Sequence, residues 1–168
     1  MTSIVVINFK DPALLRLSLK SLTRRAVEHE PYEIIVVDSQ ASVETRNVVV
    51  EEFPESTYPV RYAPFTENIG YTRGVNEGSR LAKGDYILIV NPDIIPLPGA
   101  ISALTSYLAQ HPNVGLIGPR LLNFDASPQD SCFRFYQPST IVFRRTPLGL
   151  LPWGKRALAR FAMKDVDL

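Results

Sequence analysis

The sequence predicts an α/β fold, a Rossmann-like and largely parallel sheet flanked by helices. Short runs of β-branched residues alternate with segments in which apolar residues recur at helical spacing, a pattern typical of βαβ units. The composition fits a globular domain, because 45% of the 168 residues are hydrophobic and 21% are charged. A chain of this length is expected to form one compact body.

Four strands and four helices are expected in the first two thirds of the chain. The strands are expected at residues 3–8, 33–38, 60–63 and 86–90. The helices are expected at residues 12–27, 42–53, 71–82 and 98–110. The last strand, YILIV, is apolar on both faces and is therefore expected to lie in the centre of the sheet.

The helical ranges depend on apolar stripes and on residues that begin or end helices. Pro12 and Pro98 suit a first helical turn, and Ser42 can cap the helix that follows it. Pro54 and Gly84 lie just beyond helix ends. The apolar residues that share a helical face are Leu15, Leu19, Leu22 and Ala26, then Tyr71, Val75, Gly78 and Ala82, then Ile101, Leu104 and Leu108.

The regular alternation weakens after residue 110. We expect Val114 to Gly118 to return to the sheet, Ser131 to Tyr136 to form a further strand, and Lys155 to Met163 to form a short helix. Cys132 is the only cysteine and is expected to be a small buried hydrophobe. Because it can form no internal disulfide, the cytoplasm is the expected compartment.

The charge distribution restricts the partners of the chain. A net charge of +1 gives no overall attraction to phosphate backbones, so no nucleic-acid partner is expected. No stretch approaches the roughly 18 apolar residues of a membrane span. Residues 141–168 carry six basic residues against two acidic ones, interleaved with leucines and Trp153. Peripheral contact with the inner face of a membrane is a hypothesis for this segment.

Polar residues follow the predicted strands at their carboxyl ends, where open α/β sheets bind ligands. Asn8 and Asp38 end the first two strands, residues 67–70 follow the third, and Asn91-Pro92-Asp93 follows the fourth. Asp38 could accept a hydrogen bond from a base N–H, and Asp93 could offer an oxygen ligand to Mg²⁺ or Mn²⁺. The GxGxxG and GxxxxGK[ST] motifs are missing, which disfavours dinucleotide oxidoreductases and P-loop NTPases.

Simpler structural roles stay open for the same residues. Asp38 could cap the loop that follows it, and Asn91-Pro92-Asp93 could form an ordinary turn. The helix-end positions whose polar groups could serve only the backbone are Asn68, Gly70 and Asn76.

Five sequence blocks resemble the family 2 glycosyltransferases, especially their rhamnosyltransferase-like branch. The blocks are SIVVINF at 3–9, EIIVVDSQAS at 33–42, ENIGYTRGVNEG at 67–78, GDYILIVNPD at 84–93 and HPNVGLIGPRLL at 111–122. The resemblance implies a GT-A core at 1–122 that binds a UDP- or dTDP-sugar, with 123–168 as the start of the acceptor-side region of the same domain. It also implies a divalent cation, Mg²⁺ or Mn²⁺, and inverting transfer to a saccharide or lipid-linked acceptor.

The same resemblance assigns roles to individual residues. Asn8 lies where the first strand meets the nucleotide, and Asp38 matches the aspartate that contacts the base. Asn91 and Asp93 occupy a DxD-type motif, whose final aspartate is the expected metal ligand. The residues that match the N-x-G-x(5)-N block beside the donor are Asn68, Gly70 and Asn76.

The chain departs from the family pattern at several points. Ser39 replaces the usual asparagine, and Lys10 with Asp11 replaces a small polar stretch. Family members continue beyond this length, so a truncated member is expected. Asp165, in the terminal KDVDL, is superficially similar to the family's EDVDL block and is the candidate for a catalytic role, with a solvated tail as the alternative.

Two other functions stay open at this point. The chain could be a catalytically incomplete module that only binds a sugar nucleotide. It could also be a sugar-1-phosphate nucleotidyltransferase, although those proteins usually carry a glycine-rich stretch with a basic residue after the first strand. Residues 8–12, NFKDP, contain no such stretch.

Overall fold

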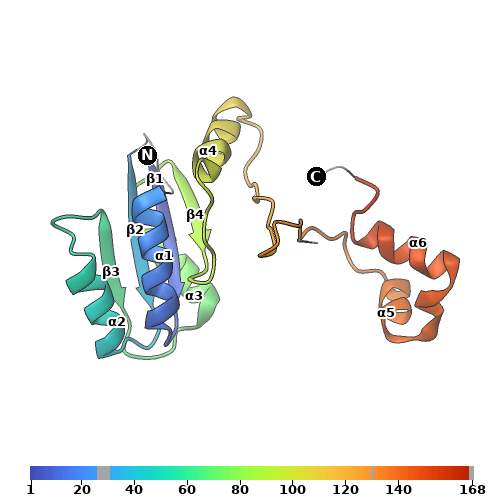
Figure 1. Ribbon diagram of the computed structural model, residues 1–168, viewed down its shortest axis with the longest axis horizontal. Coiled ribbons are helices and arrows are strands. Elements are labelled where there is room, and N and C mark those ends of the chain that lie inside the picture. Colours follow the sequence, from blue (N-terminus) through green and yellow to red (C-terminus); the bar gives the residue numbers. More distant parts are fainter. Residues whose placement is uncertain (26–30, 130, 167–168) are drawn as a thin grey trace. The chain divides into compact units, whose positions relative to one another are not determined.

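The computed structural model describes residues 1–25, 31–129 and 131–166 (Figure 1). The chain forms two compact units, Met1–Ile117 and Gly118–Leu168, where the length of the chain predicted one compact body. The division lies close to the predicted boundary after residue 122. That both regions belong to one domain stays a prediction.

The first unit is built on a four-stranded sheet in the order β3-β2-β1-β4, in which every pairing is parallel. The strands are β1 (Thr2–Asn8), β2 (Tyr32–Asp38), β3 (Val60–Pro64) and β4 (Tyr86–Val90). The helices of this unit are α1 (Pro12–Arg25), α2 (Val43–Asn47), α3 (Gly70–Leu81) and α4 (Ala100–Gln110). The predicted α/β class, a parallel sheet flanked by helices, is therefore confirmed.

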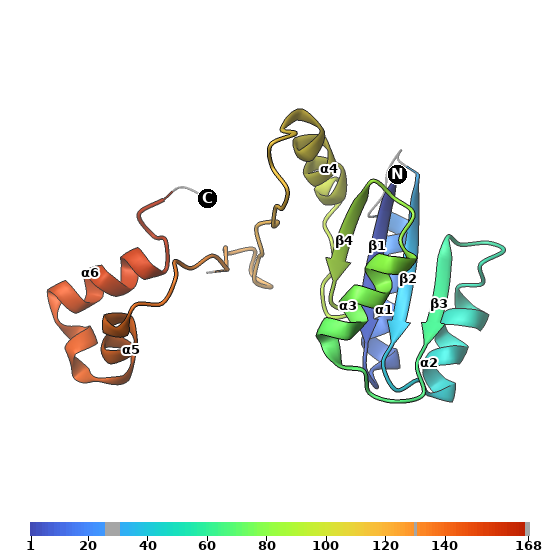
Figure 2. The same cartoon turned by 180° about the vertical axis from the view of Figure 1, so that it is seen from behind.

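Helices cover both faces of the sheet. Alternate residues of β1 point to opposite sides, so Ile4 and Val6 pack in the cluster that includes α1, while Val5 and Ile7 pack in the cluster beside α3. Figure 1 shows α1 and α2 on one face, and Figure 2 shows α3 on the other. Burial on both sides explains why the middles of β1 and β2, Ile4 to Ile7 and Ile34 to Val37, are continuous apolar runs.

Two glycines bring α3 close to the sheet. A Cβ at Gly78 would overlap Cγ1 of Val5, and one at Gly74 would lie 3.1 Å from Cγ2 of Ile7. Since residues four apart share a helical face, these two positions form one smooth strip against β1 and β2. This close packing holds the helix against the sheet, and its first residue, Gly70, lies beside the carboxyl ends of the strands.

The helix predicted over 42–53 has two parts. The hydroxyl of Ser42 accepts a hydrogen bond from the backbone N–H of Thr45 at 3.1 Å, so the predicted cap is confirmed. After α2 the chain continues as a π-helical turn, η1 (Val48–Glu52). Val48 and Val49 of this turn are buried in the same cluster as α1.

Two predictions about the sheet are wrong. β4 is an edge strand rather than a central one, because Val114 to Gly118 forms no strand beside it among the described residues. Gly115 and Gly118 are weak strand formers, and Leu116 is 90% exposed, so pairing would bury little. Ile87 in β4 is accordingly 46% exposed.

The second unit is helical and consists of α5 (Pro138–Arg145), the 3₁₀ turn η2 (Pro147–Leu150) and α6 (Pro152–Phe161). The predicted strand from Ser131 to Tyr136 does not form. Instead the rings of Phe133 and Tyr136 pack on Phe161 of α6, with centroids 5.4 and 4.7 Å away. Cys132 is exposed, so its predicted burial is also wrong.

None of the helices in the described part of the chain is both long and apolar enough to span a bilayer.

Candidate functional site

The carboxyl ends of β1 and β2 bring two predicted site residues together. Asn8 and Asp38 are register partners in the parallel pair, and Nδ2 of Asn8 donates a hydrogen bond to Oδ1 of Asp38 at 2.8 Å. Both residues have 0% exposed surface. A carboxylate buried to this degree requires hydrogen-bond donors, because desolvation otherwise disfavours its charge.

Tyr62 supplies the second donor to Asp38. It comes from β3, and its hydroxyl donates to Oδ2 of Asp38 at 2.7 Å. Burial, and then this hydrogen bond, raise the pKa of Tyr62 far above its usual 10, so the phenol stays protonated and remains a donor. From α2, Oγ1 of Thr45 accepts a weaker bond from Nδ2 of Asn8 at 3.4 Å. We call Asn8, Asp38, Thr45 and Tyr62 the strand-end cluster.

One acceptor in the strand-end cluster is unused. Oδ1 of Asn8 is buried and has no hydrogen-bond partner among the described residues. The amide cannot simply be turned round, because its N–H must face the carboxylate of Asp38. Buried acceptors normally have a partner, so this atom would accept a hydrogen bond if a water or a ligand N–H reached it.

The loops after β2 and β3 are joined by a second set of hydrogen bonds. Oγ of Ser39 donates to Oδ1 of Asn68 at 3.0 Å and accepts from the N–H of Ile69 at 3.0 Å. Oδ1 of Asn68 also accepts from the N–H of Gly70 at 2.9 Å. Gly70 has φ +72°, a left-handed conformation that favours glycine. Asn68 and Gly70 therefore shape the start of α3. Their predicted contact with a sugar nucleotide stays a prediction.

Asn91, Pro92 and Asp93 form a turn directly after β4. The N–H of Ile94 donates to the carbonyl of Asn91 at 3.1 Å, and the side chains of Asn91 and Asp93 are exposed. The structural alternative of an ordinary turn is thus observed. It leaves the Asp93 carboxylate free to reach solvent at the same edge of the sheet as the strand-end cluster, because β4 runs parallel to β1.

The other predicted residues lie elsewhere. Asn76 is exposed in the middle of α3, two residues from Gly74 and Gly78 and so on the side turned away from the sheet. Asp165 belongs to the second unit, where its carboxylate pairs with Arg134 at 2.7 Å. The hydrogen bond from Arg134 lowers the pKa of Asp165.

A metal ion would find few protein ligands among the described residues. No group of three or more His, Cys, Asp or Glu side chains converges at a possible metal site in the ranges that the structure describes. Asp93 alone offers an exposed carboxylate at the turn. One carboxylate fits Mg²⁺, which usually takes one or two from the protein and its other ligands from water and substrate phosphates.

Three residues of the site were missed from the sequence: Ser39, Thr45 and Tyr62. The sequence signal for Tyr62 is only a polar residue within the strand predicted at 60–63. Its approach to Asp38 follows from the observed register, in which Tyr62 partners Val36 and residues 36 and 38 share a face of β2. A polar residue at that position of the third strand is well placed to reach Asp38. Thr45 gave no comparable signal, since its approach to Asn8 depends on how α2 packs.

The geometry described above agrees with a family match that extends over nearly the whole chain. The model of Glycosyl transferase family 2 matches residues 3–165. The chain belongs to this family. The predicted recognition is therefore confirmed.

Two named relatives are similar over part of the chain. The chain is 32% identical over 120 residues to hyaluronan synthase of Pasteurella multocida, an alignment that covers 70% of this chain and 12% of that protein. It is 27% identical over 108 residues to N-acetylglucosaminyl-diphospho-decaprenol L-rhamnosyltransferase of Mycobacterium tuberculosis, covering 58% of this chain and 34% of that protein. The chain thus spans a minor part of the length of these relatives.

Solved structures of glycosyltransferases share the fold. The mannosyltransferase PcManGT of Pyrobaculum calidifontis, in complex with GDP-Man and Mn²⁺, superposes with a TM-score of 0.57 at 21% identity, covering 64% of this chain and 32% of that one. S. aureus TarS 1-349 in complex with UDP-GlcNAc gives 0.57 at 19% identity, covering 66% and 31%. These similarities confirm the predicted GT-A fold.

Proposed function

We propose that this family 2 glycosyltransferase chain binds a UDP- or dTDP-sugar at the carboxyl edge of its sheet and takes part in transferring the sugar to a saccharide or lipid-linked acceptor. The strand-end cluster carries the proposal, because a buried carboxylate with two fixed donors and an unused amide acceptor is a prepared polar site. The complexes of relatives with UDP-GlcNAc and GDP-Man support a nucleotide-sugar donor.

In this proposal the strand-end cluster and the turn after β4 have separate tasks. Asn8 and Asp38 recognise the base, with Tyr62 holding the carboxylate in place. Asp93 holds a divalent cation, Mg²⁺ or Mn²⁺, beside the diphosphate. A cation held there would compensate the negative charge that the leaving nucleotide gains when the anomeric C–O bond breaks. The transfer proceeds with inversion, and rhamnose is the proposed sugar.

A catalytically incomplete binding module is the second candidate, and the state of Asp165 favours it. A general base for the acceptor hydroxyl works best when its pKa lies near the working pH. The ion pair with Arg134 lowers the pKa of Asp165 instead, which weakens it as a base. No observation favours a sugar-1-phosphate nucleotidyltransferase, and the family match weighs against it.

Titration calorimetry with UDP and with dTDP, each with and without Mn²⁺, tests the proposal. We expect Mn²⁺ to strengthen binding and Asp93→Ala to remove that strengthening while leaving the metal-free affinity unchanged. Asp85→Ala is the matched control, because Asp85 precedes β4 at the amino ends of the strands and pairs with the N-terminus at 2.9 Å. Equal Mn²⁺ dependence in both variants would refute the role of Asp93, and no binding of either nucleotide would refute the donor site.

A further inference from the structure

The second unit differs sharply in charge from the rest of the chain. Residues 131–164 contain no acidic residue, and the rest of the chain carries a net charge of −6 against the overall +1. The basic residues in this range are Arg134, Arg144, Arg145, Lys155, Arg156, Arg160 and Lys164. Of these, Arg134 is neutralised by Asp165 at 2.7 Å. A strongly cationic segment therefore lies within this unit.

The same unit leaves large apolar side chains exposed although its helices are packed. The ring of Phe143 meets that of Trp153 edge-on at 5.1 Å, and Gly149 lets η2 touch the carbonyl of Phe143. Even so, Leu150 is 73% exposed, and Trp153 is 51% exposed despite its contact with Phe143. The other exposed apolar residues from α5 to the start of α6 are Ile141, Val142, Leu148 and Leu151. Such a concentration marks an interaction surface.

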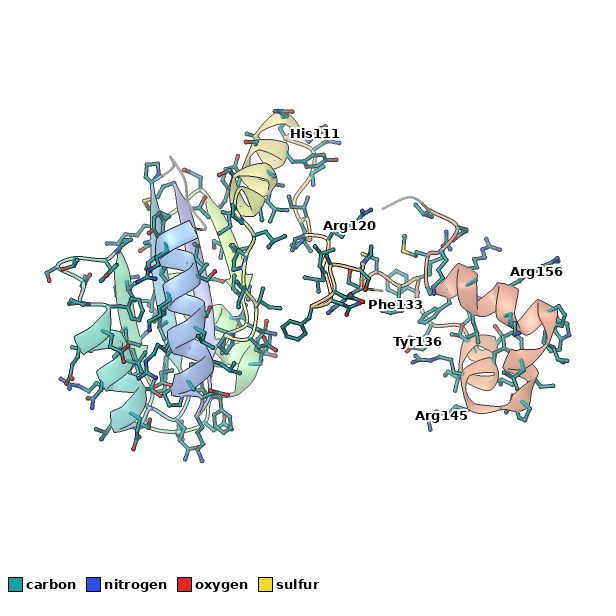
Figure 3. The ribbon with its side chains drawn as sticks, in the orientation of Figure 1. His111, Arg120, Phe133, Tyr136, Arg145 and Arg156 are labelled. Atoms are coloured by element: carbon teal, nitrogen blue, oxygen red, sulfur yellow. The ribbon has the colours of Figure 1, made fainter. Side chains whose placement is uncertain are left out.

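Cationic and aromatic groups share one face of α6. Trp153, Arg156 and Arg160 follow each other at i, i+3 and i+7, a spacing that places them along one helical stripe, and all three are exposed. Arg145 and Arg156 project outward from the ribbon (Figure 3). Tryptophan is favoured where one end of a side chain is apolar and the other wet, and arginine can bury its stem while its charge stays in water.

We propose that α5, η2 and α6 rest on an anionic lipid bilayer, with Leu150, Leu151 and Trp153 in the headgroup region and Arg156 and Arg160 on the lipid phosphates. Charge complementarity selects this occupant, because clusters of four to eight basic residues on an amphipathic helix attract anionic lipid. None of the described helices spans a bilayer, so the contact is peripheral. The proposal does not depend on the donor chemistry of the first unit.

The only tryptophan of the chain, Trp153, lies within the proposed surface and reports on it directly. The full chain is mixed with vesicles of neutral phosphatidylcholine and with vesicles that also contain phosphatidylglycerol, followed by co-sedimentation and tryptophan emission. We expect binding and a blue shift with the anionic vesicles only. Binding should weaken when ionic strength rises from about 0.1 M to about 1 M, because the Debye length falls from about 10 Å to about 3 Å.

Two matched double variants locate the surface. Arg156→Gln with Arg160→Gln should lower partitioning about 25-fold, since each cation near an anionic surface contributes roughly a factor of five. Lys20→Gln with Arg24→Gln changes the net charge equally on exposed positions of α1 and should leave partitioning nearly unchanged. Circular dichroism checks that both variants fold. If either variant does not fold, the salt titration of the unsubstituted chain still tests the proposal.

Several results would overturn the proposal. Equal binding to neutral and anionic vesicles, or no binding to either, would remove the charge argument. Binding without a blue shift, or equal losses in the two double variants, would show that another surface meets the lipid. A Trp153 already shielded from acrylamide in the absence of vesicles would show that protein, either this chain or a second copy, covers the surface.

Discussion

The hydrogen bond from Tyr62 to Asp38 allows a sharp test of how the strand-end cluster is stabilised. Tyr62→Phe keeps the ring but removes the donor that lies 2.7 Å from Oδ2 of a fully buried carboxylate. Hydrogen bonds to charged groups contribute about 1.5–3 kcal/mol, so we expect a loss of about 2 kcal/mol in the free energy of unfolding. For a unit of this size that corresponds to a melting temperature lower by roughly 6–12 °C.

Tyr58→Phe is the matched control for this loss. Tyr58 is half-buried, its ring packs edge-on against Phe53 at 5.4 Å, and its hydroxyl makes no hydrogen bond within the described ranges. We expect removal of the Tyr58 hydroxyl to lower the free energy of unfolding much less than Tyr62→Phe does, as measured by urea denaturation at pH 7. Similar losses of stability in the two variants would mean that the hydrogen bond from Tyr62 to Asp38 does not stabilise the strand-end cluster.

The pH dependence gives an independent check of the same bond. Burial, and then the bond to Asp38, raise the pKa of Tyr62 in the folded protein above its unfolded value near 10. The stability that this shift contributes is therefore complete below about pH 10 and is lost as pH rises toward the folded pKa. The difference between the unsubstituted chain and Tyr62→Phe should be constant from pH 7 to 9 and shrink above pH 10. A difference that grows above pH 10 would contradict the assignment.

Two further substitutions test the framework around the site, each followed by urea denaturation. Gly78→Ala should lower stability by about 1–3 kcal/mol, because the new Cβ overlaps Val5 and α3 must move away from the sheet. Gly115→Ala should have almost no effect, because a Cβ there meets open space. Ser42→Ala should cost about 1 kcal/mol through loss of the α2 cap, and Ser56→Ala in an exposed turn should cost far less.

The sequence predicted the parallel sheet and its polar edge because the signals there are local. The strands ending in Asn8 and Asp38 are continuous apolar runs, and a parallel arrangement necessarily places their carboxyl ends together. The stripe of Leu15, Leu19 and Leu22 predicted α1 in the same way, and all three residues are fully buried. What was predictable is therefore what each segment determines by its own periodicity.

The errors arose where structure depends on neighbours. Val114 to Gly118 has an apolar pattern, but whether it forms a strand depends on pairing with the outer edge of β4, which sequence spacing does not determine. Ser131 to Tyr136 alternates in a strand-like way, yet Phe133 and Tyr136 find partners in Phe161 instead. Tyr62 was missed for a related reason, since its importance comes from Asp38 on the adjacent strand.

The strand order also indicates that the two aspartates of the proposed donor site contact different parts of the ligand. Asp38 follows β2 and Asp93 follows β4, and β1 lies between these strands. Two inter-strand spacings amount to about 9.5 Å, whereas two oxygen ligands of one Mg²⁺ lie within roughly 4 Å of each other. At that separation Asp38, whose two oxygens already accept from Asn8 and Tyr62, is not a partner for Asp93 at one ion. In the proposed donor site, one extended nucleotide sugar would pass over the end of β1 and reach both residues, with its base toward Asp38 and its phosphates toward Asp93.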